Sequence, residues 1–401
     1  MKGFLLGDAL AALPFEHLVS LSPAENELLE WATAHSKSVL APLEHAAPVK
    51  DVVCWQMLSA MAQEGILAAN MPARLGGSLA ADLPTARLFA IIRRGLTRHS
   101  SIGDELYVAH NLGLYPALRW GDSAEVRDWV GKGVRGDALF AYAMTEAAAG
   151  SDPAGMQTTA HLDGDSWILR GSKRFITNAP DADAYTVFAK TDPEQGGRGI
   201  SAFLVLRTDR GLKPGPLIGM SAPHPIGELT FDDCSIPRTR LLGPLNTGLS
   251  IGLETLRIFR ISVAAQGVGW IERAIELALE RARSRETFGR PLIDHVGIQE
   301  KLARMTSRLH ASNALVLIAA ALADEGDDDD AAAKFSSVAK AYCTEAAFEA
   351  AFEAQQIWGA EGLILGHPLD ELLRETRQAI MYEGPSEIQR LIVGRRLGLK
   401  V

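Results

Sequence analysis

The spacing of apolar and polar residues divides the chain into three parts. Within residues 1–138, apolar residues recur three and four positions apart, which is the period of an α-helix. One such stripe covers Leu28–Val39 after the helix-starting Pro23, and a second covers Met57–Ile66. The segment Pro72–Gly77 interrupts the pattern and predicts a loop. We therefore expect an N-terminal helical domain.

Residues 139–248 show the shorter period of β-strands. Leu139–Met144 is a strand-like apolar run, and Ala184–Ala189 and Ala202–Leu206 are further short runs of this kind. Asp163–Gly164 is a dipeptide typical of a two-residue hairpin turn. Because no long helical stripe occurs here, this part predicts a central all-β domain.

The helical period returns in residues 249–401. Val268, Ile271, Ile275 and Ala278 form one apolar stripe, with glutamates on the opposite face. Further helices are expected over residues 299–323, 334–357 and 387–397. This part predicts a C-terminal helical-bundle domain similar to a four-helix bundle. The chain as a whole is expected to be an α+β multidomain protein.

Composition narrows the range of functions. The chain has 401 residues and a formal net charge of −9, which argues against a general nucleic-acid-binding surface. Its longest clean apolar run, Ala314–Ala323, is too short to span a membrane. Cys54, Cys234 and Cys343 are far apart, with neither metal-ligand spacing nor a disulfide pattern. We therefore predict no metal site. Since Asp8 interrupts the apolar N-terminus, we expect no signal peptide and predict a cytoplasmic protein.

Two polar features have a plain structural interpretation. His110, with its neighbour Asn111, could face a substrate, but a packed or solvent-facing histidine is the more common arrangement. Asp327–Asp330 is a run of acids between predicted helices. A solvated loop explains the run better than a cation site, and Asp330 is expected to cap the next helix.

The most informative chemical pattern lies near the C-terminus, in Met381–Arg390. Glu383 stands between Tyr382 and Gly384, in the turn before a predicted helix. Gly384 lets the main chain approach a ligand closely, and Pro385 suits the first turn of a helix. A carboxylate held among apolar groups has a raised pKa and acts as a general base. A solvated turn residue is the alternative for Glu383 when this stretch is considered alone.

Five stretches together resemble the acyl-CoA dehydrogenase family. They are Met144–Asp152, Phe175–Asn178, Arg285–Gly289, Gln356–Gly362 and Met381–Arg390. They are similar to that family's Thr-Glu-Pro-x-Ala-Gly-Ser-Asp, Trp-Ile-Thr-Asn, Arg-x-x-Phe-Gly, Gln-Ile-x-Gly-Gly-x-Gly and Tyr-Glu-Gly-Thr-Ser-Glu-Ile-Gln-Arg motifs, in the same order. The resemblance is close from about residue 139 onward and loose before it. It implies the acyl-CoA dehydrogenase fold and an FAD-dependent α,β-dehydrogenation of an acyl thioester.

The resemblance also implies roles for individual residues. Glu383 would be the catalytic base that removes the α-proton, while the β-hydrogen passes as hydride to flavin N5. Thr145 and Thr177 would face the polar edge of the flavin, Phe175 would pack on its ring, and Ser151 would bond a phosphate. Considered alone, these residues belong to an Ala-rich turn and an ordinary strand pair. Because no Gly-x-Gly-x-x-Gly follows a strand, a nicotinamide site of the Rossmann type is not expected.

In the family, the residues matching Arg285 and Phe288 reach the FAD of a neighbouring subunit, and those matching Gln356 and Gly359 receive its adenosine-phosphate part. A homotetramer and an electron-transferring flavoprotein as electron acceptor are thereby implied. The remaining implied cofactor contacts are Tyr142, Met144, Gly150, Ile176, Ser386 and Glu387. The implied substrate contacts are Ser151, Phe259, Arg260, Tyr382 and Gly384.

Several residues depart from the family pattern. Arg257 stands where many members have Asp near the CoA tail, and Val296 where many have a Gln beside FAD. Ala147, Ala360 and Pro385 replace Pro, Gly and Thr in the motifs. These changes leave open a carrier-protein thioester in place of acyl-CoA, and a non-catalytic relative that has lost FAD. A flavin oxidase or monooxygenase of the same fold is also open, although such relatives typically alter the glutamate that Glu383 retains.

Overall fold

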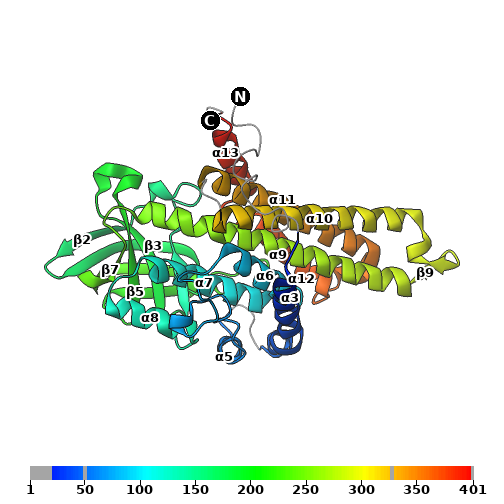
Figure 1. The fold of residues 1–401 in the computed structure, drawn as a ribbon, viewed down its shortest axis with the longest axis horizontal. Helices are drawn as coiled ribbons and strands as arrows, with labels where there is room; N and C mark the ends of the chain where they lie inside the picture. The colour runs from blue at the N-terminus through cyan, green and yellow to red at the C-terminus, as the bar shows by residue number, and fades with distance from the viewer. Residues whose placement is uncertain (1–19, 48–51, 326–328, 399–401) are drawn as a thin grey trace. The chain divides into compact units, whose positions relative to one another are not determined.

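The computed structural model describes residues 20–47, 52–325 and 329–398, which form two compact units (Figure 1). The helical unit takes its described residues from Met1–Ala41, Thr85–Ser101 and Arg257–Val401. The sheet unit takes its described residues from Pro42–Pro84 and Ile102–Leu256.

In the helical unit, an ion pair connects α3 (Pro23–His35) and α6 (Ala86–Leu96). The Ser22 hydroxyl accepts a hydrogen bond from the Glu25 N–H, and the Glu25 carboxylate accepts one from the Ser22 N–H at 2.8 Å. This reciprocal arrangement satisfies N–H groups that the start of α3 would otherwise leave without a partner. Arg87 on α6 pairs with the same carboxylate, and both side chains are largely buried.

The rest of the helical unit is a bundle of helices, four of which share one core. Its helices are α9 (Gly248–Ser284, from Arg257 onward), α10 (Val296–Asp324), α11 (Asp329–Trp358), α12 (Pro368–Ala379) and α13 (Ser386–Arg396). Figure 1 shows α9, α10 and α11 running side by side. Alanines of α11, such as Ala347 and Ala351, pack in the same core as Trp270 of α9 and Met305 of α10. Small side chains let the helices approach one another closely, so the bundle keeps a dense core. A short hairpin of β9 (Glu286–Thr287) and β10 (Arg290–Pro291) joins α9 to α10.

The sheet unit consists of an antiparallel-rich sheet and of helices that precede it in the sequence. The helices are α4 (Ala41–Ala46), α5 (Trp55–Gln63), α7 (Ser101–Trp120) and α8 (Ala124–Val134). The strands are β1 (Phe140–Ala143), β2 (Thr159–Asp163), β3 (Ser166–Thr177), β4 (Ala184–Lys190), β5 (Ile200–Leu206), β6 (Leu212–Leu217), β7 (Ile226–Pro237) and β8 (Leu241–Leu242). Within the described ranges, these strands form one sheet in the order β6-β7-β3-β2-β4-β5-β8, and β1 pairs in parallel with β4.

The longest strands, β3 and β7, pair in antiparallel fashion with two irregularities in register. One falls between Leu169 and Gly171 and the other between Lys173 and Ile176. Such irregularities bend a strand and re-aim its side chains. The hairpin expected at Asp163–Gly164 is confirmed, because β2 and β3 pair antiparallel up to that turn and Gly164 has a φ of 57°.

The expected fold class is confirmed: helices precede a central sheet, and a helical bundle follows it. Three local expectations were wrong. Ile66 lies beyond α5, which ends at Gln63 before the left-handed Gly65. Asp330 lies inside the first turn of α11 instead of capping it, and Pro385 is the cap residue of α13 instead of its first-turn residue. The division into three domains at 138/139 and 248/249 stays a prediction.

Some expectations concern residues that the structure does not describe, namely the N-terminal stretch around Asp8 and the acids Asp327 and Asp328. In the described part of the chain, no helix has both the length and the apolarity needed to cross a membrane.

Gly113 on α7 provides a test of the packing in the sheet unit. A Cβ at this position would lie 2.6 Å from the carbonyl carbon of Ala141 on β1, where only main-chain movement can make room. We expect Gly113→Ala to lower the free energy of unfolding by about 1–3 kcal/mol, the usual cost of overpacking. Urea unfolding followed by circular dichroism measures this change.

Gly297→Ala is the matched control. Nothing lies within 4 Å of a Cβ built on Gly297, which is also helical. Its unfolding midpoint should stay the same or rise slightly. An unchanged midpoint for Gly113→Ala would contradict the close packing of α7 on β1.

Candidate functional site

The predicted site residues fall into two groups, one in each unit. The helical unit contains the Glu383 stretch together with Arg260, and the sheet unit contains the stretches around Thr145 and Thr177.

Backbone strain marks three of the predicted site residues. Among the described residues other than glycine, six have a positive φ. Three of them are Asn or Asp, which tolerate this conformation. The other three are Phe175, Phe288 and Glu383, with φ values of 57°, 51° and 52°. Residues in such conformations need support from their surroundings and concentrate at functional sites.

Glu383 lies in the turn Ile380–Gly384 between α12 and α13, hereafter the Glu383 turn, as the sequence predicted. The residue is half-buried. Its carbonyl oxygen accepts hydrogen bonds from Arg260 Nε at 3.3 Å and from Gln389 Nε2 at 3.1 Å. The turn is therefore attached to α9 and α13 through the main chain of Glu383 itself.

A buried lysine completes the support of this turn. Lys340 on α11 donates from Nζ to the Ile380 carbonyl at 3.1 Å and to the Gly384 carbonyl at 2.9 Å. Burial lowers the pKa of Lys340 to about 7, although the nearby Glu383 carboxylate acts in the opposite direction. Lys340 lies outside the motifs that the sequence pointed to.

The neighbouring Tyr382 is fixed by a polar contact and by packing. Its hydroxyl donates to Gln266 Oε1 at 2.5 Å, and its ring packs against the core of the bundle. Because Gln266 is fully buried on α9, the tyrosine has a firm anchor beside the glutamate.

In the sheet unit, the main chain brings the two threonine stretches together. The Arg174 N–H donates to the Thr145 carbonyl at 2.9 Å. Thr145 and Thr177 are half-buried, and Phe175, two residues before Thr177 on β3, leaves 46% of its surface exposed. An exposed aromatic ring with two half-buried threonines in the adjoining main chain is suited to a flat, polar-edged ligand.

An ion pair lies behind Thr145. Lys173 Nζ donates to Glu146 Oε1 at 2.8 Å and to the Met144 carbonyl at 3.1 Å, and both side chains are buried. Burial lowers the pKa of Lys173 to about 8, with Glu146 opposing the change. Burial alone would raise the pKa of Glu146, but Lys173 and the hydrogen bonds from Gln157 and Thr158 hold it below its ordinary value.

Thr177 has a buried polar neighbour of its own. Its Oγ1 lies 2.8 Å from His224 Nε2, within hydrogen-bonding distance. On the other side of the imidazole, Nδ1 lies 3.6 Å from Glu105 Oε2 on α7. His224 and Glu105 are both buried, so the orientation of the Thr177 hydroxyl is controlled from inside the sheet unit.

The other predicted cofactor residues of the sheet unit differ in exposure. Tyr142 donates from its hydroxyl to the Gly252 carbonyl at 3.1 Å. Met144 and Ile176 are buried, whereas Gly150 and Ser151 are exposed. The structure therefore brings Met144, Thr145 and the Phe175 stretch together, and it leaves Gly150 and Ser151 at the surface of the unit.

The remaining residues of the helical unit also differ in exposure. Phe288, in the β9–β10 hairpin, is 97% exposed, which is unusual for a phenylalanine. Arg285, Gln356, Gly359 and Glu387 are exposed as well. Ser386 and Phe259 are buried, and Phe259 packs on Phe89 with ring centroids 5.0 Å apart. The ligand contacts assigned to these residues stay predictions.

The interpretation of His110 as a packed histidine is confirmed. His110 is fully buried on α7, and its Nδ1 accepts a hydrogen bond from the Phe140 N–H at 3.3 Å. Burial lowers its pKa to about 4. Of the departures from the family pattern, Arg257 pairs with Asp329 at 2.5 Å.

The supporting residues Lys340, Lys173, His224 and Gln389 were missed in the sequence. For Lys340 the available signal was a polar residue in a buried stripe. Lys340 lies on the buried side of α11 with Ser336, Thr344 and Ala347, at spacings of three to four residues. A lysine in such a position is almost always there for a specific partner.

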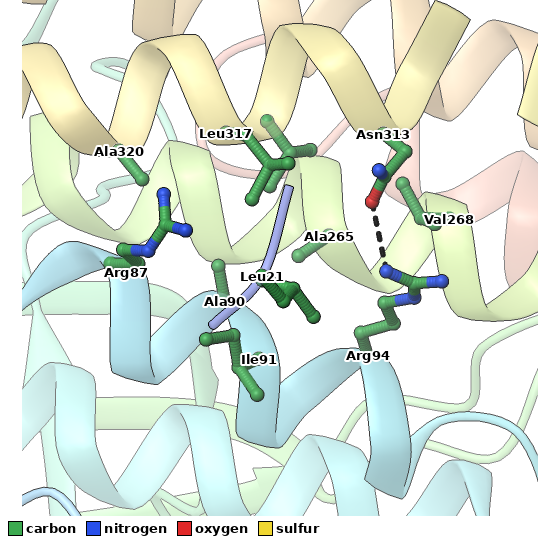
Figure 2. Close-up of a pocket in the computed structure, with 11 residues that line it drawn as sticks. Leu21, Arg87, Ala90, Ile91, Arg94, Ala265, Val268, Asn313, Leu317 and Ala320 are labelled. Atoms are coloured by element: carbon green, nitrogen blue, oxygen red, sulfur yellow. Dashed lines mark hydrogen bonds between the residues drawn. The ribbon is translucent and has the colours of Figure 1, made fainter. Parts of the chain in front are cut away.

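A small cavity lies elsewhere in the helical unit, among α6, α9 and α10 (Figure 2). It has room for roughly one water molecule. Arg94 lies at its edge and donates to Asn313 Oδ1 at 2.8 Å. No predicted site residue lines this cavity, so it is a packing feature and not a substrate pocket.

Known proteins are similar to this chain over most of its length. Residues 141–234 match the family model of the acyl-CoA dehydrogenase middle domain, and residues 246–398 match that of the C-terminal domain. An acyl-CoA dehydrogenase of Bacillus subtilis (strain 168) is 35% identical over 366 residues, which cover 90% of this chain and 94% of the relative.

Solved structures show the same similarity. Butyryl-CoA dehydrogenase from Megasphaera elsdenii superposes with a TM-score of 0.89 at 30% identity, covering 95% of this chain and 99% of that one. PigA with FAD and proline superposes with a TM-score of 0.88 at 27% identity, covering 96% and 100%.

Removing the partner of Glu146 tests the ion pair behind Thr145. We expect Lys173→Met to lower the free energy of unfolding at pH 7 by about 3–5 kcal/mol, because it leaves a buried carboxylate without its cation. In the unaltered protein, the pKa of Glu146 is lower in the folded state than its ordinary 4.5. Its stabilising contribution is therefore complete above pH 4.5 and is lost as the pH falls through the folded pKa. Lys173→Met should reduce this acid sensitivity, as measured by urea unfolding at pH 7 and pH 4.

Lys213→Met is the control for this prediction, since Lys213 pairs with Asp232 at the surface of the same unit. Its effect should stay below about 1 kcal/mol. Equal effects of the two substitutions would show that the buried pair contributes no more than a surface pair.

Proposed function

The chain belongs to the acyl-CoA dehydrogenase family, and from this premise we propose that it uses FAD to oxidise the Cα–Cβ bond of an acyl thioester, with Glu383 as the base. The observation that carries the proposal is the Glu383 turn. There a half-buried carboxylate with a strained backbone is fixed through its main chain by side chains from other helices. A solvated turn residue has no need of such support.

The reaction transfers one proton and one hydride. The Glu383 carboxylate accepts the proton from Cα, and the electron pair of that C–H bond forms the Cα=Cβ double bond as hydride leaves Cβ. FAD, when bound, accepts the hydride. Gly384, with a φ of 92° and no side chain, lets the substrate approach the turn, and the Glu383 N–H is proposed to bind the thioester carbonyl.

The residues of the sheet unit fit a flavin. Phe175 offers an exposed ring, and Thr145 and Thr177 offer hydroxyls at half-buried positions in the adjoining main chain. Thr177 is held by His224 at 2.8 Å, so its hydroxyl is oriented before any ligand arrives. A flat ring with a hydrogen-bonding edge needs this combination of stacking surface and oriented polar groups. We propose that these three residues contact the isoalloxazine ring and that Ser151 bonds a phosphate.

The exposed residues of the helical unit suggest where subunits meet. We propose that Arg285 and Phe288 reach the FAD of a neighbouring copy, with Gln356 and Gly359 at its adenosine-phosphate part, in a homotetramer. A phenylalanine that is 97% exposed supports such an interface. An electron-transferring flavoprotein as electron acceptor, a role in fatty acid metabolism and a cytoplasmic location are proposed with it.

A prolyl or other carrier-bound thioester is the second candidate substrate. The similarity to the structure of the prolyl acyl carrier protein oxidase AnaB, with a TM-score of 0.86 at 26% identity, favours it. Arg257, which stands where many family members have Asp near the CoA tail, agrees with this candidate. An oxidase would differ from a dehydrogenase in the rapid reaction of its reduced flavin with oxygen.

The first test is an absorption spectrum of the purified protein, followed by anaerobic addition of acyl-CoAs of different chain length. We expect a flavin spectrum that one of the acyl-CoAs bleaches. Bleaching only by carrier-bound thioesters would favour the second candidate. A protein that takes up no flavin even when FAD is supplied would overturn the proposal.

Glu383→Gln tests the base. The substitution keeps the size of the side chain but removes its ability to accept a proton. We expect it to bind FAD and to unfold like the unaltered protein, while flavin reduction by acyl-CoA becomes slower by at least about 10³-fold. Glu349→Gln, at an exposed position of α11 paired with Arg308, should react at the normal rate. Normal flavin reduction by Glu383→Gln would remove Glu383 from the catalytic role.

A further inference from the structure

The two ends of the Glu383 turn are joined by a single buried side chain. Lys340 donates both to the Ile380 carbonyl, where α12 ends, and to the Gly384 carbonyl, just before α13. Gln389 of α13 donates to the Glu383 and Gly384 carbonyls at 3.1 and 2.9 Å. Consecutive carbonyls of the turn are thus bonded from α11 and from α13.

The turn needs this support because its backbone is strained. Glu383 and Gly384 both have positive φ, at 52° and 92°. For a glutamate this conformation costs free energy, and it persists only where surrounding contacts compensate. A Cβ on Gly384 would collide with Gln389 Nε2. Gln389 can therefore bond the carbonyls of the turn only because residue 384 is a glycine.

Burying a lysine to supply hydrogen-bond donors costs free energy, because its charge must leave water. Lys340 has no exposed surface, and its Nζ donates to the main-chain carbonyls of Ile380 and Gly384. Core packing alone would be served as well by methionine or leucine. Its presence on the buried side of α11 therefore points to a task that only a long side chain with several N–H donors can perform.

Four charged side chains act on Lys340. They are Glu383 in the turn, Arg260 on α9, Glu345 on α11 and Glu387 on α13. The positive charge of Lys340 lies near the Glu383 carboxylate and stabilises its ionised form, which is the form that accepts a proton. The lysine thus acts on the base through the main chain and through charge.

We propose that Lys340 is a positioning residue for the base: it closes the Glu383 turn by bonding its two ends, and so fixes where the Glu383 carboxylate meets the substrate. This inference rests on the proposed function, since it assumes that Glu383 removes the α-proton.

The experiment compares Lys340→Met and Lys340→Gln with the unaltered holoenzyme. Methionine fills the space without donors, and glutamine keeps a donor without the charge. The control is Lys334→Met, which removes a partly exposed lysine from the same helix. Hydrogen–deuterium exchange of the peptide that covers residues 380–387 reports on the turn without requiring catalysis.

The second measurement isolates the proton step. With the flavin fully reduced beforehand under anaerobic conditions, hydride transfer is blocked, and deuterium from D₂O enters the α-position of an acyl-CoA only through the base. Mass spectrometry of the recovered acyl-CoA gives the rate. FAD content and the unfolding temperature are measured on the same samples.

We expect Lys340→Met to speed amide exchange in residues 380–387 and to slow α-proton exchange by about 10²-fold, the size of effect that a misplaced catalytic group causes. The loss should appear in kcat with little change in KM, with FAD content retained. In both exchange rates, Lys340→Gln should lie between Lys340→Met and the unaltered protein. Lys334→Met should match the unaltered protein.

Unchanged amide exchange in Lys340→Met would overturn the inference, and so would faster amide exchange with an unchanged rate of α-proton exchange. If Lys340→Met does not fold, Lys340→Gln decides by the same two measurements. Failure of the proposed function gives a different result: the unaltered holoenzyme would then exchange no α-proton of any acyl-CoA, while the amide-exchange comparison would still show whether Lys340 holds the turn.

Discussion

The hydrogen bonds to the carbonyls of the Glu383 turn are the constraint on which the candidate active site depends. A glutamate with a φ of 52° does not hold its conformation unaided, and here Arg260 and Gln389 bond its carbonyl while Lys340 and Gln389 bond the next one. These donors come from α9, α11 and α13, so the bundle must be assembled before the turn is fixed. The long helices thus hold the hydrogen-bond donors that fix the main chain of this one short segment.

The sequence predicted the fold class and the location of Glu383 because those features leave local signals. Helical stripes, short β runs and the Asp163–Gly164 turn are each visible within a few residues, and the structure contains all three. The supporting residues leave a weaker signal. Lys340 lies 40 or more residues from the carbonyls it bonds, and His224 lies 47 residues from Thr177. Neither pairing follows from spacing, because only the packed fold brings these segments together.

The local errors have a related cause. The apolar pattern that reaches Ile66 suggested a longer helix, but Gly65 takes a left-handed conformation and ends α5 before it. At Pro385, a φ of −60° suits the first helical turn, but its extended ψ of 161° makes it the cap. In both cases one backbone conformation overrode a side-chain pattern.

In both units, a buried lysine bonds main-chain carbonyls of an irregular loop. In the helical unit, buried Lys340 bonds the Ile380 and Gly384 carbonyls on either side of Glu383. In the sheet unit, buried Lys173 bonds the Met144 carbonyl next to Thr145. A long side chain with several donors can bind an irregular loop from inside a core, where water cannot supply the same bonds. Burial lowers the pKa of each lysine, to about 7 and about 8, because it removes the charged form from water. Since an irregular loop in each unit carries a predicted site residue, a lysine in a buried stripe is a signal worth seeking when a strained loop follows elsewhere in the chain.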